Sequence, residues 1–456
     1  AEIEAERNPA LLALREAAAV RGVAFLPDDD FVSVGLGTGS QTWPVSEIPD
    51  PEAVDWPEVH DIPVALVTGT NGKSTTVRLT AAMAQAAGRT AGRCSTDFVR
   101  VGDTVVERGD WSGPGGARAV LRHTGAELAI LETARGGMLR RGLALSRAEV
   151  ALVTNVGEDH LGDYGILTLD DLVEVKLTIR RAVESDGVLV LNADDDGLVR
   201  HARDYSGTVC WFSLDPDNPV LAAHRRAGGR TCSVEDGEIV WTWGDAREVV
   251  LPVADIPIAL GGAAKHNVAN ALAAVALAKE LGLPTDAIRA GLQAFRGDAA
   301  DNPGRGNYFE IGGAKVLVDF AHNPHGVGAI ADTARALPAE RRLVLIGQAG
   351  DRTDAEIRGL ARAAWRADPD HVLIAALADY RRGRETGEVP ALLDDELHRL
   401  GAPSEHVTHV SDPIAGVRAA LDWMQPGDLL LLFVLSQRDE AFAVLREAQA
   451  HAASVG

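Results

Sequence analysis

One stretch decides how this chain folds: Val64-Ala65-Leu66-Val67-Thr68-Gly69-Thr70-Asn71-Gly72-Lys73-Ser74-Thr75-Thr76. It begins as an apolar run, turns between two glycines, and continues from Val77 with a helical pattern. A strand, a glycine-rich turn and a helix in this order are typical of a phosphate-binding loop. The glycines let several backbone N–H groups converge on one phosphate, and the helix directs the positive end of its dipole at the same anion. The sequence therefore predicts a nucleotide site at this turn.

The side chains of this loop suit a nucleotide that is bound together with Mg²⁺. We predict that Lys73 neutralises the β- and γ-phosphates and that Ser74 holds the cation. The pattern G-x-x-x-x-G-K-[ST] has glycine where this chain has Val67, so a glycine-rich turn with a surface lysine is the alternative. Nucleotide contacts are expected from the whole loop: Gly69, Thr70, Asn71, Gly72, Lys73, Ser74 and Thr75.

Composition narrows the classes of protein and partner. The chain has 456 residues, and at about 150 residues per domain this length predicts about three domains. A net charge of −22 with a pI near 5.0 argues against nucleic acid as a partner, because binding to nucleic acid needs clustered Lys and Arg. No apolar run approaches the ~20 residues that cross a bilayer, so no membrane partner is expected. The three cysteines form no C-x-x-C pair, which is typical of a cytoplasmic protein without disulfides or thiolate zinc.

Apolar strands alternate with helical patterns from Asp61 onward, and this alternation predicts an α/β fold. We expect a central P-loop ATP-binding domain at residues 61–298, with a doubly wound and mostly parallel sheet. The segment 297–306 breaks all periodicity, so a smaller C-terminal Rossmann-like α/β domain is expected at residues 299–456. Residues 1–60 precede the pattern and are expected to form a short N-terminal appendage.

Some elements can be placed in more detail. In the appendage, a helix is expected over Pro9–Arg21 and a loop over the glycine-rich residues 35–40. An amphipathic helix is expected over Leu169–Ser185. Between residues 205 and 260, short strands are expected as antiparallel additions to the main sheet. Three tryptophans there are expected in the core: Trp211, Trp241 and Trp243.

Polar residues that follow two apolar strands form a candidate cation site. Glu132 comes directly after one strand, and residues 155–160 follow the next. Ligands of doubly wound sheets gather at the carboxyl ends of strands, so these residues are expected near the phosphate-binding loop. Ser74 and Glu132 could hold one Mg²⁺, and His160 could hold a second. A capping or surface histidine is the alternative for His160.

Several motifs, in the same order along the chain, resemble those of the Mur ligase family. The likeness is strongest to the Mur-ligase-like half of the cyanophycin synthetases, and it extends from about residue 61 to about residue 395. The family motifs are Thr68–Thr76, Leu131–Gly137, Asn155, Asp159–Gly162, Lys176, His266–Ala271, Pro303–Arg305 and Asp319–Pro324. The runs that favour the cyanophycin synthetases are Glu132–Gly137, Gly109–Pro114, Arg381–Arg384 and Gly387–Val389.

The resemblance implies ATP-dependent synthesis of an amide bond. A carboxylate attacks the γ-phosphate of ATP, an acyl phosphate forms, and an amine displaces phosphate. Such phosphoryl transfer depends on positioning and charge neutralisation, which Lys73 and two cations can supply without a covalent nucleophile on the protein. By similarity, Ser74 and Glu132 bind the first Mg²⁺ and His160 the second. Lys176 matches a lysine that CO₂ carbamylates in Mur ligases, and a negative carbamate suits a site beside two cations.

Two of these assignments have structural alternatives. Lys176 could be an ordinary exposed helix lysine, since Glu174 and Arg180 lie close by in the sequence. By similarity, Asn267 and Asn270 contact adenine, whose edge needs both a donor and an acceptor. Asn267 could instead cap its helix.

The resemblance also assigns residues of the C-terminal domain. Arg305 and Asp319 are expected to reach the phosphates and the ribose, and His322 and Asn323 to line the cleft. Asp351 and Arg352 match a loop that often holds the incoming amino acid. Arg352 could make a bidentate contact with an α-carboxylate, or it could pair with Asp354 on the surface.

Departures from the family bear on the substrate. Cyanophycin synthetases place an ATP-grasp module before the Mur-like half, and residues 1–60 are too few to contain one. We therefore expect one kind of amide bond, joining an amino acid to a small or aspartyl-like carboxylate acceptor. The domain with which Mur ligases grip a uridine nucleotide is also missing or reduced, so peptidoglycan precursors are not expected as acceptors.

Three functions remain in competition. The first is an ATP-dependent carboxylate–amine ligase that acts on small-molecule acids and amino acids. The second is a nucleotide-binding pseudo-ligase, or scaffold subunit, for a separate ATP-grasp partner. The third is a ligase like folylpolyglutamate synthetase, which shares the phosphate-binding loop but lacks the runs 132–137 and 381–384. Self-association into a homo-oligomer is compatible with the resemblance to the cyanophycin synthetases.

Overall fold

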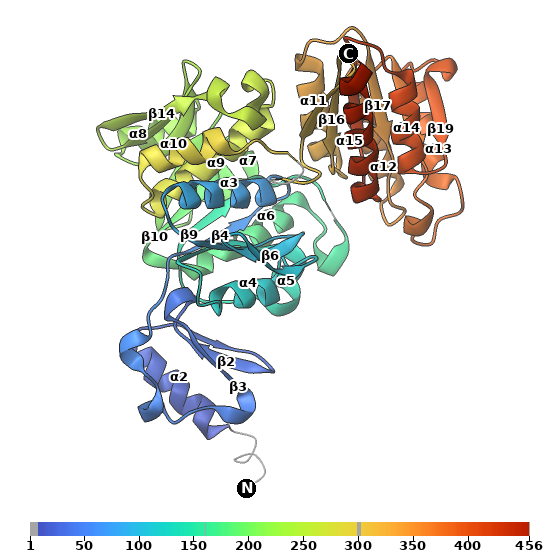
Figure 1. The fold of residues 1–456 in the computed structure, drawn as a ribbon. Coiled ribbons are helices and arrows are strands. Elements are labelled where there is room, and N and C mark those ends of the chain that lie inside the picture. Colours follow the sequence, from blue (N-terminus) through green and yellow to red (C-terminus); the bar gives the residue numbers. More distant parts are fainter. Residues whose placement is uncertain (1–7, 160, 299–301, 456) are drawn as a thin grey trace. The chain divides into compact units, whose positions relative to one another are not determined.

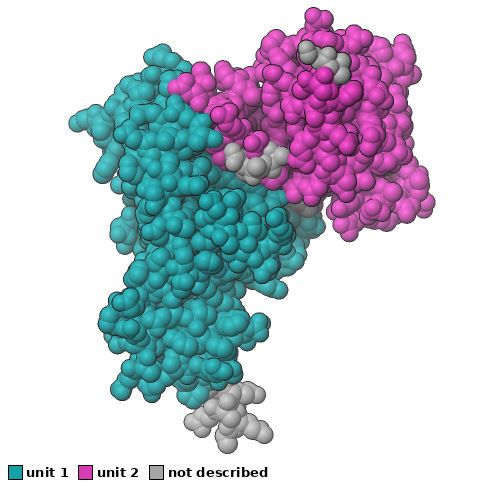
Figure 2. Space-filling model, viewed as in Figure 1, with its two compact units in different colours: residues 1–156, 162–252, 269–294 teal, residues 157–161, 253–268, 295–456 magenta. Residues whose placement is uncertain are grey.

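The computed structural model describes residues 8–159, 161–298 and 302–455 (Figure 1). The chain forms two compact units, coloured separately in Figure 2. Unit 1 comprises residues 1–156, 162–252 and 269–294, and unit 2 comprises residues 157–161, 253–268 and 295–456. In the described ranges, none of the helices has the length and apolar character needed to cross a membrane.

The N-terminal part of unit 1 packs a helix on a small sheet. Helix α2 (Pro9–Arg21) confirms the expected bounds: the Asn8 side chain accepts a hydrogen bond from the Leu11 N–H, and Gly22 ends the helix in the left-handed conformation. The glycine-rich residues 35–40 form a loop with one short 3₁₀ turn, as expected. The three antiparallel strands are β1 (Phe25–Pro27), β2 (Phe31–Val34) and β3 (Gln41–Pro44).

Arg122 joins this appendage to the rest of unit 1. Its guanidinium pairs with Asp28, donates to Ser33 Oγ at 2.6 Å, and donates to the backbone oxygens of Leu26 and Phe31. Arg122 follows helix α4 (Pro114–Leu121), which packs on the main sheet. Arg122 is therefore one largely buried cation that ties the small sheet to the central domain, alongside backbone contacts such as the Thr38 N–H to the Ala126 oxygen.

The main sheet of unit 1 has eleven strands in the described residues, and its middle is parallel (Figure 1). The phosphate-binding strand β4 (Val64–Thr68) lies at the centre, between β8 (Leu128–Glu132) and β9 (Ala148–Val153), and pairs with both in parallel. All five residues of β4 are buried, which explains its unbroken apolar run. On one side follow β5 (Ala91–Cys94), β6 (Phe98–Val101) and β7 (Thr104–Arg108). On the other side follow β10 (Val183–Asn192), β11 (Thr208–Ser213), β12 (Arg230–Glu235), β13 (Glu238–Trp243) and β14 (Ala246–Pro252).

The expectation that residues 205–260 add antiparallel strands to the main sheet is correct only in part. Strands β11 and β12 continue the parallel part of the main sheet, and only β13 and β14 are antiparallel. Trp211 and Trp241 are buried as expected. Trp243 is wrong as a core residue, because its side chain is exposed and the Arg230 guanidinium lies over its ring.

Two helices differ from the sequence pattern at one end each. Helix α3 (Lys73–Ala86) begins at Lys73, four residues before the apolar pattern that starts at Val77. Helix α6 (Leu169–Leu177) ends well before Ser185, where the chain passes through a 3₁₀ turn into β10. The remaining helices of this region are α5 (Arg135–Arg141), α7 (Asp196–His201), α8 (Pro219–Arg226), α9 (Lys265–Glu280) and α10 (Thr285–Ala294).

Unit 2 is built on a second sheet with helices on both faces (Figure 1). Its strands are, in order across the sheet, β15 (Asn307–Ile311), β16 (Ala314–Asp319), β20 (Leu429–Phe433), β17 (Arg342–Ile346), β18 (His371–Ala375) and β19 (Val407–Val410). Only β15 is antiparallel to its neighbour. The helices are α11 (Pro324–Ala336), α12 (Asp354–Trp365), α13 (Glu388–Arg399), α14 (Pro413–Trp423) and α15 (Arg438–Val455).

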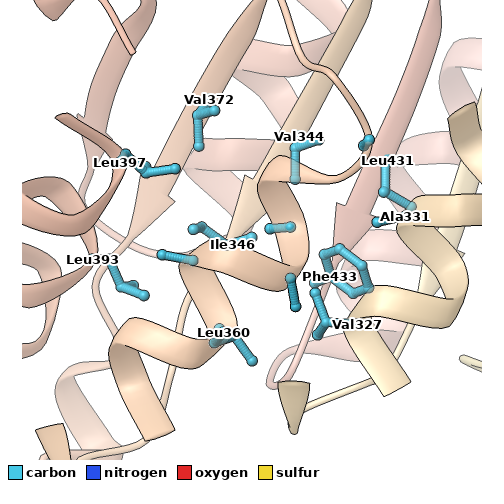
Figure 3. Packing of buried hydrophobic residues seen from close by; sticks show 14 of the residues in the cluster. Val327, Ala331, Val344, Ile346, Leu360, Val372, Leu393, Leu397, Leu431 and Phe433 are labelled. Carbon is cyan, nitrogen blue, oxygen red and sulfur yellow. The ribbon is translucent and has the colours of Figure 1, made fainter. Parts of the chain in front are cut away.

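The packing on one face of this sheet explains its apolar strands. Side chains from β17, β18 and β20 meet side chains from α11, α12 and α13 in one buried cluster (Figure 3). Ile346, Leu360 and Phe433 are examples from a strand, a helix and the neighbouring strand. The fold class is thus confirmed as α/β, with a large mixed sheet in unit 1 and a separate sheet in unit 2. The division into three domains stays a prediction.

Candidate active site

The loop after β4 has the backbone shape of a phosphate-binding loop. Gly69 and Gly72 have φ angles of 147° and 86°, which side chains rarely tolerate. There is also no room for a side chain, because a Cβ on Gly69 would lie 1.9 Å from Thr154 Oγ1 and one on Gly72 would lie 2.1 Å from Asn270 Oδ1. Val67 is still inside the strand and pairs with Glu132 and Leu152, so the backbone bends only after it. The missing first glycine is therefore compatible with the loop.

Two residues after β9 fix the tip of this loop. Asn155 accepts a hydrogen bond from the Asn71 N–H at 3.0 Å and donates from its amide to the Asn71 oxygen at 3.1 Å. Thr154 Oγ1 donates to the same oxygen at 2.6 Å. Asn155 was among the strand-end residues that the sequence singled out, whereas Thr154 was not. These contacts hold the loop in shape before any ligand arrives.

Lys73 folds back into its own loop. Its ammonium donates to the backbone oxygens of Gly69 at 3.1 Å and Thr70 at 3.0 Å, and the side chain is half-buried. The positive charge thus lies at the first turn of α3, where the uncapped N–H groups of the helix also point. An anion placed there would meet both the ammonium and the N–H groups.

Ser74 and Glu132 meet beside this loop, as the sequence predicts. Ser74 Oγ donates to Glu132 Oε2 at 2.7 Å, and the Glu132 side chain is 1% exposed. Glu132 Oε1 is buried and has no hydrogen-bond partner among the described residues. A buried carboxylate oxygen without a partner is costly, and a divalent cation would satisfy it with the hard oxygen ligands that Mg²⁺ prefers. The pair therefore fits a Mg²⁺ ion whose other ligands come from a bound phosphate.

Sequence reasoning missed a third oxygen beside this pair. Thr96 Oγ1 lies 3.5 Å from Ser74 Oγ, in the turn between β5 and β6. The same turn contains Asp97, which pairs with Arg78 of helix α3; the Arg78 side chain is 1% exposed and lies over the Phe98 ring. Thr96 belongs to no periodic pattern, and Arg78 is a charged residue within the helical pattern that starts at Val77. The residues come together only because β5 is the next strand to β8.

Lys176 is buried, and its burial decides between the two interpretations of this lysine. The side chain is 4% exposed, while Glu174 and Arg180 pair with each other at 3.3 Å. The alternative of an ordinary exposed helix lysine is therefore wrong. Lysine is rarely buried without a specific role for its nitrogen, so burial is compatible with the carbamylation that the resemblance implies. His160 lies outside the described residues.

The two asparagines of helix α9 lie in different environments. Asn270 faces the phosphate-binding loop, with its Oδ1 against Gly72 in unit 1. Asn267 belongs to unit 2, is 7% exposed, and donates from its amide to the Ile258 oxygen at 3.0 Å. It is the third residue of α9, so the alternative of a helix cap is wrong. Beside it, desolvation lowers the pKa of His266 to about 4.

In unit 2, Asp319 ends β16 as a buried carboxylate. Burial raises its pKa to about 6, although the Ala321 N–H and the Arg305 charge act in the opposite direction. Asn323 caps helix α11, because its Oδ1 accepts from the Gly326 N–H at 2.8 Å. His322 is mostly exposed next to this cap. The expected phosphate and ribose residues, Arg305 and Asp319, are thus within electrostatic reach of each other.

Arg352 does not pair with Asp354. Its guanidinium lies 3.7 Å from Asp159 Oδ1, and its side chain is 9% exposed. Asp354 pairs instead with Arg384 at 2.8 Å, so the alternative of a surface Arg352–Asp354 pair is wrong. Asp351, next to Arg352, is exposed. Within unit 2, the predicted amino-acid loop is therefore joined to the segment that follows β9.

A cleft of about 410 Å³ lies elsewhere on unit 1. His201 Nδ1 lies 2.6 Å from Glu174 Oε1, and Arg200 and Arg180 pair with Asp170 and Glu174. Three of the charged or titratable side chains that line the cleft, Arg180, Arg200 and His201, are thus already paired with carboxylates. It is lined by Glu174, Arg180, Arg200, His201, Asp204 and Tyr205.

Comparisons with known proteins agree with this geometry. Residues 67–278 match the Mur ligase middle domain, and residues 304–433 match the Mur ligase, glutamate ligase domain. Cyanophycin synthetase of Crocosphaera subtropica is 36% identical over 372 residues, which cover 82% of this chain but 42% of that protein. The chain thus spans less than half the length of those relatives. UDP-N-acetylmuramyl-tripeptide synthetase of Deinococcus radiodurans is 30% identical over 394 residues, 82% of this chain and 73% of that protein.

Solved structures share the fold at lower identity. E. coli FolC in complex with DHPP and ADP has a TM-score of 0.61 at 20% identity, and covers 84% of this chain and 89% of its own. MurF from Acinetobacter baumannii has a TM-score of 0.58 at 18% identity, with 85% and 77% covered. One conclusion follows from both domain matches, from the relative that is aligned over most of its length, and from the loop with its Ser74–Glu132 pair. The chain belongs to the Mur ligase family.

Proposed function

We propose that this chain is an ATP-dependent carboxylate–amine ligase that forms an amide bond through an acyl phosphate. The observation that carries the proposal is the buried Ser74–Glu132 pair beside a phosphate-binding loop, in which Glu132 Oε1 has no hydrogen-bond partner within the described part of the chain. A module that only bound a nucleotide would not need to bury a carboxylate at that cost. The proposed substrates are an amino acid and a small or aspartyl-like carboxylate acceptor.

The loop and its neighbours are proposed to bind ATP. The N–H groups at the start of α3 and the Lys73 ammonium would surround the β- and γ-phosphates. Lys73 would exchange its two backbone partners, Gly69 and Thr70, for phosphate oxygens. Asn267 and Asn270 are proposed to contact adenine, and Arg305 and Asp319 to contact the phosphates and ribose.

Ser74 and Glu132 are proposed to hold the first Mg²⁺, which neutralises charge on the phosphates. Glu132 would bind through Oε1, while Oε2 keeps the Ser74 hydroxyl in place. His160 and a carbamylated Lys176 are proposed for a second ion. Burial of Lys176 supports this assignment, because a carbamate can bind a cation where an ammonium cannot.

The proposed reaction has two steps. An oxygen of the acceptor carboxylate forms a bond to the γ-phosphorus, and the bond from that phosphorus to ADP breaks. The amine nitrogen then forms a bond to the acyl carbon, phosphate leaves with its bonding electron pair, and the amine loses a proton. Lys73 and the loop position the phosphate throughout, so the protein contributes mainly orientation and charge. Arg352 is proposed to hold the α-carboxylate of the incoming amino acid.

One experiment tests this proposal. The purified protein is incubated with ATP, Mg²⁺ and pairs drawn from panels of amino acids and acidic acceptors, and phosphate release is measured. We expect release that depends on both substrates, is abolished by Lys73→Ala, and falls at least about 100-fold in Glu132→Gln. Lys315→Ala, which removes an ammonium from β16, is the matched control and should retain activity.

The alternative has a distinct outcome. If ATP binds but no pair of amine and acceptor stimulates release, the ligase proposal fails. The chain would then act as a nucleotide-binding scaffold for a separate ATP-grasp partner. Lys176→Ala distinguishes the two functions further. It should strongly reduce phosphate release by a ligase, whereas a scaffold would bind ATP equally well with and without the substitution.

A further inference from the structure

The run Arg381–Arg384 has no role in the proposed reaction, although the sequence singled it out. It lies in unit 2, between a short 3₁₀ turn (Ala378–Tyr380) and the start of helix α13. Arg381 and Arg382 are exposed, whereas the Arg384 side chain is 16% exposed. Arg384 is therefore the member of the run that the fold encloses.

The Arg384 guanidinium makes four polar contacts, and three of them go to one loop. Its Nε donates to the Gly350 oxygen at 3.0 Å, and its Nη2 donates to the Arg352 oxygen at 2.6 Å. Nη2 also pairs with Asp354 Oδ1 at 2.8 Å. The fourth contact, from Nη1 to Glu388 Oε1 at 2.6 Å, anchors the guanidinium to the first turn of α13.

The backbone of the same two segments is in direct contact. The Gly350 N–H donates to the Tyr380 oxygen at 2.8 Å. A Cβ on Gly350 would lie 1.9 Å from the Arg381 oxygen, so only glycine allows this approach. We call residues 350–354, which lead into the first residue of helix α12, the amine loop. Contacts from residues 380–384 hold this loop in place.

Arg352 lies in the middle of these contacts. Its backbone oxygen is bound by Arg384, while its own guanidinium points to Asp159 at 3.7 Å. The planar fork of an arginine can bind two carbonyls and two carboxylates at fixed angles, which a lysine cannot. One side chain therefore holds the backbone oxygens of Gly350 and Arg352 and the carboxylate of Asp354.

We propose that Arg384 is a positioning residue that fixes the amine loop so that Arg352 presents its guanidinium to the carboxylate of the incoming amino acid. This inference rests on the proposed function of Arg352. Arg384 itself touches neither substrate nor nucleotide. Its loss should weaken capture of the amine and leave the affinity for ATP unchanged.

The test compares Arg384→Lys and Arg384→Gln with the protein as it is. Arg382→Gln is the matched control, because it removes a charge from the same run, and the Arg382 guanidinium lies over the Tyr380 ring without a hydrogen bond or ion pair to the described residues. We expect both Arg384 variants to raise the KM for the amino acid at least about tenfold, with the KM for ATP changed less than about twofold. Arg382→Gln should leave both values within about twofold.

A second readout separates this proposal from the ligase proposal. Hydrogen exchange at the Gly350 amide should become at least about tenfold faster in the Arg384 variants and stay unchanged in Arg382→Gln. If the unmodified protein forms no amide, the proposed function fails, yet the exchange result still tests the loop. Full activity of Arg384→Lys, equal losses for both substrates, or unchanged exchange would each overturn the positioning role.

Discussion

At the scale of residues, two buried glutamates have different expected roles because their neighbours differ. Glu132 and Glu280 each keep one buried oxygen without a hydrogen-bond partner among the described residues. Glu132 faces Ser74 beside the phosphate-binding loop, where a cation can satisfy it. Glu280 ends helix α9 against Arg230 at 2.7 Å. Its burial raises its pKa to about 7, despite the lowering effect of Arg230.

Glu280 therefore predicts a pH dependence of stability. Between about pH 4.5 and 7 the folded state binds a proton that the unfolded state has released, so the unfolding free energy falls as pH rises through this window. Glu280→Gln cannot titrate and should escape this loss. We expect its stability relative to the unmodified protein to increase by about 2–3 kcal/mol from pH 4.5 to pH 8. Chemical unfolding of both proteins at the two pH values measures it, and a constant difference would contradict it.

Residue-level sequence reasoning succeeded where strands impose the geometry. Ser74 and Glu132 were expected together because ligands of a doubly wound sheet gather at the carboxyl ends of its strands, and the structure pairs β4 with β8. Thr96 and Arg384 could not be predicted in the same way. Both lie in turns whose positions depend on tertiary contacts, and a turn shows no hydrophobic period from which its neighbours can be inferred.

At the scale of elements, boundaries were predicted well only where local signals agree. Helix α2 has Asn8 before it, Pro9 at its first position and Gly22 after it, and its bounds were predicted correctly. Helix α6 was predicted too long, because the apolar pattern continues through a 3₁₀ turn into β10. Its Thr168–Asp171 capping box marks the start clearly, but no glycine marks the end.

The attachment of the appendage gives an element-level prediction. Arg122→Ala should leave Asp28 without its ion-pair partner and remove one donor each from Ser33 Oγ and the backbone oxygens of Leu26 and Phe31. We expect the small sheet to lose about 2 kcal/mol or more of protection against local opening. Hydrogen exchange of the β2 amides measures this loss.

The control for that experiment is Arg226→Ala. Arg226 is exposed, and its Nε donates to the Ala222 oxygen of its own helix, α8. It should leave the β2 amides unchanged. Equal exchange in Arg122→Ala and the unmodified protein would show that the Arg122 side chain does not hold the small sheet.

At the scale of the whole molecule, all three cysteines share the same environment. Cys94, Cys210 and Cys232 are free and fully buried, and burial raises the pKa of each thiol above its usual range. Reaction with iodoacetamide needs an accessible thiolate. The native protein should therefore remain unlabelled at pH 8, and the denatured chain should take up three labels. Mass spectrometry counts the labels, and a labelled cysteine in the native protein would contradict the buried positions.

The edge of the main sheet has a consequence for the behaviour of the protein at high concentration. Strand β7 ends the sheet, all five of its residues are exposed, and among the described strands it has a neighbour on one side only. Such an edge is a template for intermolecular strand addition, and Val105 and Val106 supply the apolar surface that aggregation favours. Glu107 and Arg108 follow directly, and charges at that position oppose the approach of another chain. We therefore expect Glu107 and Arg108 to limit strand addition at this edge, which lies far along the sheet from the phosphate-binding strand.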